Sequence, residues 1–155
     1  MRIHGHNLGD HFRLLTPLLA LITAVWVLRI ILGAVGVPDK VVRIFSVNVT
    51  AAASTLLAVV IIHWRRFGSY SNVVVAAFVL MNWSQLLIIG AIGFSVLTGI
   101  QTVFSAPEYS FGLSPARHMI GHLTFGLGSG SLLGAAIGCL LLWMLRTLVP
   151  ARAGR

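Results

Sequence analysis

Glycine recurs at every fourth position in the most distinctive stretch of the chain, which runs from His118 to Gly138 and is otherwise largely apolar. The glycines of this register are Gly126, Gly130, Gly134 and Gly138. On an α-helix, residues four apart lie on one face, and extending this face backwards reaches His122 and His118. Membrane helices associate through close approach of their backbones, which small residues at this spacing allow. The stretch therefore predicts a membrane helix whose glycine face contacts either a helix of the same chain or a partner chain.

The composition indicates that the whole chain belongs in a membrane. Of its 155 residues, 57% are hydrophobic and only 9% are charged, and the mean hydropathy is +0.95. About a quarter of the residues in a soluble domain are charged. The eleven Lys and Arg flank apolar segments instead of clustering on one solvated face, which argues against nucleic acid as a partner. The single cysteine, Cys139, excludes a disulfide within the chain.

Four apolar segments are long enough to cross a bilayer, which takes about 20 residues. We expect helices over residues 14–37, 44–63, 73–100 and 116–149. Ser114 followed by Pro115 is typical of an N-cap and a first helical residue, and it marks the start of the fourth helix. The polar residues of the four segments do not recur in register, so we see no internal repeat. The predicted fold is all-α, a single transmembrane domain over residues 1–155 that forms a four-helix bundle.

The distribution of basic residues predicts the orientation of this bundle. Four spans place both termini on the same side of the membrane, together with seven basic residues: Arg2, Arg13, Arg65, Arg66, Arg146, Arg152 and Arg155. Three basic residues fall on the other side: Lys40, Arg43 and Arg117. Cytoplasmic loops carry the excess of Lys and Arg. We therefore expect both termini to be cytoplasmic, in a bacterial-type inner (plasma) membrane.

Three polar residues within the apolar segments are candidates for a ligand site or a polar pathway: Arg29, Asn82 and Gln85. A charge near the centre of a membrane helix costs at least about 2.5 kcal/mol. Arg29 therefore either extends to the outer interface or faces the bundle, where the amides, Glu108 or a bound anion would meet it. Asn82 and Gln85 lie near the middle of the third segment, where they either line a polar path or form hydrogen bonds between helices.

His118 and His122 lie four residues apart, a spacing at which one helix can offer two nitrogens to a metal ion. Zinc takes three or four protein ligands, and Glu108 and Tyr109 in the preceding loop could complete such a site. Either histidine is also a candidate axial ligand of a haem, alone or with a partner subunit. The simpler interpretation places both histidines at the membrane interface, bonded to loop carbonyls. It requires no cofactor; haem or a divalent metal is the alternative.

The sequence holds no nucleophile elbow, phosphate-binding loop, zinc protease motif or paired-cysteine motif. It also shows neither a midplane carboxylate nor a broken helix, which are typical of transporters. We therefore predict a protein that is not an enzyme and acts by helix association, as a homo-oligomer or an accessory subunit of a larger membrane complex. One alternative is a channel or transporter for a small solute or an anion. The other is a haem- or metal-binding redox subunit that uses His118 and His122.

Overall fold

The structure is a computed structural model that describes residues 2–3, 5–107 and 112–149. It is all-helical apart from one short hairpin, and four of its helices are long and apolar enough to cross a membrane, as predicted. In chain order the elements are β1 (Arg2–Ile3), β2 (His6–Asn7), α1 (Leu8–Ala34), α2 (Asp39–Ile44), α3 (Val47–Trp64), α4 (Tyr70–Thr98), α6 (Pro115–Gly121), η1 (His122–Gly130) and α7 (Ser131–Leu148). β1 and β2 pair antiparallel.

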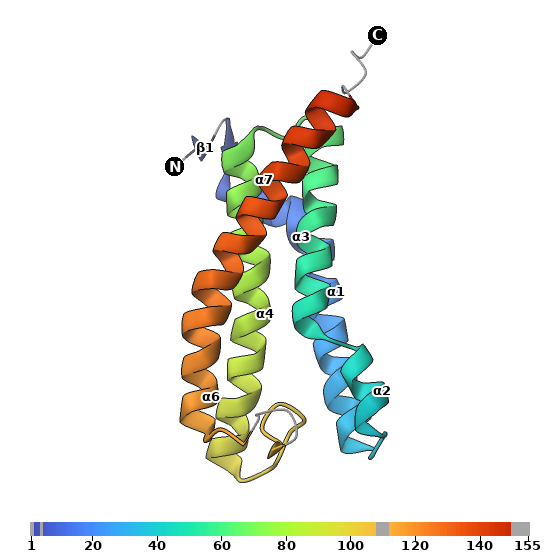
Figure 1. Cartoon of the computed structure of the whole chain (residues 1–155), viewed down its shortest axis with the longest axis vertical. Helices are drawn as coiled ribbons and strands as arrows, with labels where there is room; N and C mark the ends of the chain where they lie inside the picture. Colours follow the sequence, from blue (N-terminus) through green and yellow to red (C-terminus); the bar gives the residue numbers. More distant parts are fainter. Residues whose placement is uncertain (1, 4, 108–111, 150–155) are drawn as a thin grey trace.

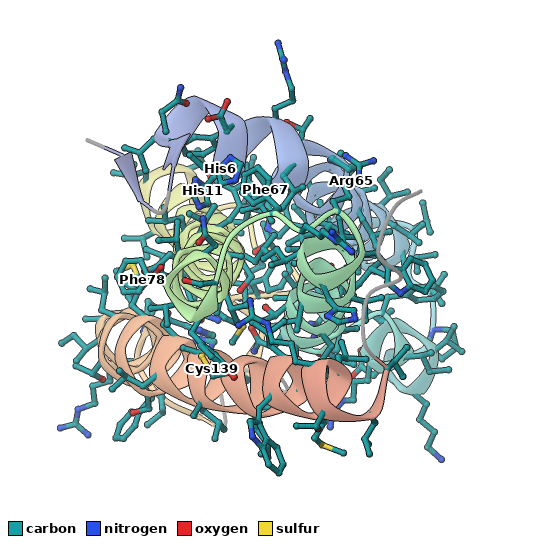
Figure 2. All side chains as sticks on the ribbon, turned by 90° about the horizontal axis from the view of Figure 1, so that it is seen from above. His6, His11, Arg65, Phe67, Phe78 and Cys139 are labelled. Carbon is teal, nitrogen blue, oxygen red and sulfur yellow. The ribbon has the colours of Figure 1, made fainter. Side chains whose placement is uncertain are left out.

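The helices are arranged as a central pair with one helix on each side. α3 and α4 pack against each other, and both α1 and α7 pack against this pair. Viewed along the bundle, α1 and α7 lie on opposite sides of α3 and α4 (Figure 2). The start of α1 and the end of α7 lie at the same end of the molecule (Figure 1). The core of the bundle is therefore built around α3 and α4.

The first helix begins at Leu8, six residues before the predicted start at residue 14. Asn7 and Asp10 form a capping box: the Asn7 side chain accepts from the Asp10 amide at 2.9 Å, and the Asp10 carboxylate accepts from the Asn7 amide at 2.8 Å. Such a cap satisfies amide groups that the first turn leaves without partners. The last six residues of the polar segment, 8–13, are therefore helical. The predicted start of the fourth helix, with Ser114 as N-cap and Pro115 as first residue, is confirmed.

The second span is broken, which corrects the prediction of one helix over 44–63. α2 ends at Ile44 and α3 begins at Val47, and the two residues between them are not helical. Ser46 has an extended backbone and caps α3, because its hydroxyl accepts from the amide of Val49 at 3.4 Å. The segment before the break carries Asp39, Lys40 and Arg43, and no glycine or proline lies at Phe45 or Ser46 to mark the break itself. The expectation that the chain has no broken helix is therefore wrong.

The fourth span is continuous but not α-helical throughout. α6 and α7 are joined by η1, a π-helix of nine residues in which amides bond to carbonyls five positions back. η1 contains Gly126, Gly128 and Gly130, and residues this small are compatible with both the α-helix and the π-helix. π-helical turns are rare and are frequently found at functional sites. The glycine face was predicted from α-helical spacing, but these nine residues have π-helical geometry.

The predicted glycine face is the seam by which the fourth span packs inside its own chain. A Cβ atom at Gly126 would meet the side chain of Gln85, and one at Gly130 would lie 3.2 Å from Cε of Met81. Gly134 faces Met81 and Ala77 of α4 in the same way. The sequence left open whether the glycine face contacts a helix of the same chain or a partner chain. In the structure it contacts helices of the same chain. The glycine face gives no support to an interface with another chain.

We expect the substitution Gly138→Leu to lower the free energy of unfolding by about 1–3 kcal/mol, the usual cost of overpacking. A Cβ atom at this position would lie 2.9 Å from Cγ1 of Val73 and 3.2 Å from Cγ2 of Val59, so α7 must move away from both α3 and α4. Unfolding in detergent micelles, followed by circular dichroism, measures the effect. Ala136→Leu is the matched control, because Ala136 lies on the exposed side of α7. An equal loss at both positions would contradict this packing.

Candidate functional site

Four polar side chains form a continuous row of hydrogen bonds inside the bundle, which we call the polar track. Its members are Asn48, Gln85, His122 and His118. Nε2 of Gln85 donates to Oδ1 of Asn48 at 2.9 Å, and Oε1 of Gln85 lies 2.6 Å from Nδ1 of His122. Nε2 of His122 in turn lies 3.2 Å from Nε2 of His118. The polar track thus connects α3 and α4 to the start of the fourth span.

Gln85 holds the polar track at the middle of α4, about 20 Å from either end of that helix at 1.5 Å per residue. Its side chain is only 2% exposed. His122 lies close to this level because it contacts Gln85 directly, and His118 lies one turn nearer the start of α6. The prediction that both histidines bond loop carbonyls is therefore wrong. Packing of η1 against α4 brings His122 to Gln85 instead, and His118 contacts His122.

Gly126 makes room for Gln85. A Cβ atom at Gly126 would collide with the amide group of Gln85, so any larger residue would displace the side chain at the centre of the polar track. Gly126 belongs to the π-helical segment, which begins at His122. The π-helical geometry and Gly126 therefore both shape the part of the fourth span that packs against Gln85.

The direction of each hydrogen bond follows from the amide of Gln85. Its Nε2 group donates to Asn48 and also to Oγ of Ser84, at 2.9 Å and 3.2 Å. Its Oε1 atom is then an acceptor, so His122 donates through Nδ1–H and leaves Nε2 without a proton. His118 donates to that nitrogen through its own Nε2–H. Nδ1 of His118 is buried and has no hydrogen-bond partner among the described residues.

The polar track is accessible from outside the bundle core. Asn48 is exposed, in the first turn of α3 directly after the break at Phe45 and Ser46. His118 and His122 are each partly exposed. The buried Gln85 is thus reached from two exposed ends. A small ligand could contact the amide and imidazole groups without unfolding the bundle.

An apolar layer separates the polar track from the opposite end of the molecule. Its members are fully buried: Val59, Val73, Leu80 and Leu142. Beyond it lies a second polar group, in which Nε2 of the buried His11 lies 3.1 Å from Nδ2 of Asn72. His6 stacks on Phe67 beside them, with ring centroids 3.8 Å apart (Figure 2). Two polar regions are therefore divided by a tightly packed apolar core.

Asn82 and Gln85 were predicted to share a site, but the structure gives them different partners. Nδ2 of Asn82 donates to the Phe78 carbonyl at 2.6 Å and to Oγ of Ser131 at 3.1 Å. This contact joins α4 to the start of α7, in the manner of an ordinary hydrogen bond between membrane helices. We therefore assign Asn82 to helix packing and leave it out of the polar track.

Arg29 lies against the connection that follows α4. Its Cζ atom is 5.0 Å from the ring centroid of Phe104, which is itself 4% exposed. A guanidinium over an aromatic ring is attracted to the negative face of that ring. This contact stabilises the guanidinium near the end of the bundle. Glu108 and Tyr109, the other residues proposed around it and around the histidines, lie outside the described residues.

Sequence reasoning singled out Gln85 and both histidines but did not join them, and it missed Asn48 as a partner. The sequence feature that could have identified Asn48 is its polar side chain near the start of an apolar segment, two residues after Ser46. Within the described part of the chain, no three His, Cys, Asp or Glu side chains gather at one point. No family model, curated protein or solved structure matches the chain.

We expect a double-mutant cycle of Gln85→Leu and His122→Leu to show coupling of about 0.6 kcal/mol, and up to about 1.7 kcal/mol. Each single substitution leaves its partner with an unsatisfied polar group, whereas the double substitution removes both groups. Unfolding in detergent micelles provides the four stabilities. The matched cycle of Asn82→Leu with His122→Leu should be additive, because these residues share no partner. Coupling of equal size in both cycles would contradict the polar track.

Proposed function

We propose that the chain is a small membrane channel or transporter whose pathway includes the polar track. In this proposal the four long helices are inserted in a bilayer with both termini in the cytoplasm, as the seven-to-three distribution of basic residues favours. The chain is then a membrane protein of the bacterial inner-membrane type. The observation that carries the proposal is the row of hydrogen bonds from His118 to Asn48 at the level of the middle of α4.

Polar groups within a membrane bundle are expensive and by default indicate a ligand or ion pathway. Many transporters place such groups beside a discontinuous helix, because unwound backbone is tolerated only where protein or a cavity surrounds it. Here the break between α2 and α3 comes directly before Asn48. The π-helical segment begins at His122, on the other side of Gln85. Two irregular helices thus meet at the polar track.

The apolar layer around Leu142 gives this pathway a closed position. Apolar constrictions stop conduction because water leaves them, and they open when the surrounding helices separate. Leu142, Val59 and Val73 are all fully buried and lie between the polar track and the cytoplasmic end of the proposed topology. In this proposal the apolar layer closes the pathway towards the cytoplasm.

The chemistry of the polar track favours a neutral or cationic ligand. Its groups are two amides and two imidazoles, which present oxygen and nitrogen lone pairs. Arg29, which would have favoured an anion, contacts Phe104. We therefore narrow the proposed ligand from a small solute or anion to a small neutral solute or a cation.

Association into a homo-oligomer or a larger membrane complex remains a prediction. It rested mainly on the glycine face, and Gly130 and Gly134 contact α4 within the same chain. These contacts account for the glycine spacing without a partner helix. For this reason we give the transport proposal priority.

We expect purified protein in liposomes to pass at least one of three probes: protons followed with internal pyranine, glycerol followed by light scattering, and Zn²⁺ followed with an internal dye. Gln85→Leu should abolish most of this flux, because it removes the polar group at the centre of the pathway. Leu142→Ala should raise it, because it thins the apolar layer. Asn82→Leu is the matched control and should leave flux unchanged. Vesicles that are as tight as protein-free ones to all three probes would refute the proposal.

A further inference from the structure

We propose that His118 and His122 bind one divalent transition-metal ion through their Nε2 atoms. These two atoms lie 3.2 Å apart. Two nitrogens bonded to the same Zn²⁺ at about 2.0–2.1 Å with tetrahedral angles lie roughly 3.3 Å apart. The ring centroids are 4.9 Å apart and the ring planes are tilted by 43°, a separation compatible with two imidazoles bound to one ion. On metal binding the Nε2 proton of His118 would move to Nδ1, which has no hydrogen-bond partner among the described residues. The ion would then lie between the two Nε2 atoms with little movement of either ring.

The surroundings of His122 are those of a metal ligand. A ligating histidine generally donates its second ring N–H to an oxygen atom, which fixes the tautomer and the orientation of the ring. Nδ1 of His122 has such a partner in Oε1 of Gln85 at 2.6 Å. Gln85 is in turn held by Asn48 and Ser84. The Nε2 lone pair of His122 is thus oriented towards His118 by groups that would not touch the metal.

The site offers two protein ligands and leaves the other positions of the metal to water or another small ligand. Among the described residues no third His, Cys, Asp or Glu joins the pair. Structural zinc sites are closed by four protein ligands, whereas a site with open positions exchanges its ion and its bound water more readily. Exchangeable binding suits an ion that passes through the protein. The inference therefore names the cation of the proposed pathway, and it rests on the proposed function only in that respect.

The chemical class of the ion follows from its ligands. Imidazole suits Zn²⁺, Cu²⁺ and Ni²⁺, and the general order of affinity places Cu²⁺ above Zn²⁺. Mg²⁺ and Ca²⁺ prefer oxygen ligands and more of them, so this pair should not retain either ion. The competing explanation is that the two imidazoles form only a hydrogen bond with each other. The two explanations differ in whether the purified protein takes up metal.

The test is metal binding by the full chain in detergent micelles, without a histidine tag and in a Cys139→Ala background that removes the only thiol. Equilibrium dialysis with Zn²⁺ gives stoichiometry and affinity, and electron paramagnetic resonance of Cu²⁺ counts the coordinated imidazole nitrogens. We expect one ion per chain, with two nitrogens in the Cu²⁺ spectrum. His118→Gln and His122→Gln should each lose the site. His6→Gln and His63→Gln are matched controls at the opposite end of the bundle and should keep it.

Gln85→Leu provides a test that retains both ligands. We expect Zn²⁺ affinity to fall about 10- to 100-fold, the usual effect of losing a hydrogen-bond partner of a metal-bound histidine. If His122→Gln fails to fold, His118→Gln still decides the matter, because among the described residues Nε2 of His118 bonds to His122 alone. Saturable binding that survives both His→Gln substitutions, or no saturable binding at all, would overturn the inference. Metal binding by a protein that passes none of the three probes would overturn the proposed transport function and leave the metal site intact.

Discussion

Gln85 is a buried amide at the middle of the bundle, and its need for hydrogen-bond partners shapes the centre of the molecule. An unpaired amide in such surroundings costs several kcal/mol at the upper end of the measured range. Asn48 and Ser84 accept from its nitrogen, and His122 donates to its oxygen. Two features of the backbone allow these contacts. α3 begins at Val47, directly before Asn48, and Gly126 leaves space for the amide group of Gln85. The irregular parts of two helices are thus found around one side chain.

The number and order of the membrane-length helices could be predicted from the sequence, because bilayer thickness sets a minimum length that apolar runs show directly. The break at Phe45 and Ser46 could not, since neither a glycine nor a proline marks it and the basic residues before it only indicate where the apolar segment begins. The π-helical winding of η1 was equally hidden, because small residues are compatible with α and π geometry alike. Spacing grouped Asn82 with Gln85, yet only tertiary packing decides that one faces Ser131 and the other His122.

The glycine face and the two histidines of the polar track lie in the same span for a physical reason. Glycines bring the backbone of the fourth span close to α4, and this proximity also brings His122 within hydrogen-bond distance of Gln85. A helix with large residues on this face would stand further away and leave the amide unsatisfied. The stretch that first drew attention for its packing therefore also positions the polar groups.

The π-helical segment changes how the fourth span tolerates variation in length. In an α-helix each residue turns the chain by about 100°, so one deletion rotates every later contact away from its partner. A π-helix holds surplus chain, because its amides bond one residue further back. Removal of the exposed Ser129 would let η1 tighten to α geometry while Gly138 stays against α3 and α4. A deletion of one residue between His122 and Ser131 is thus absorbed locally, without shifting the helix that follows.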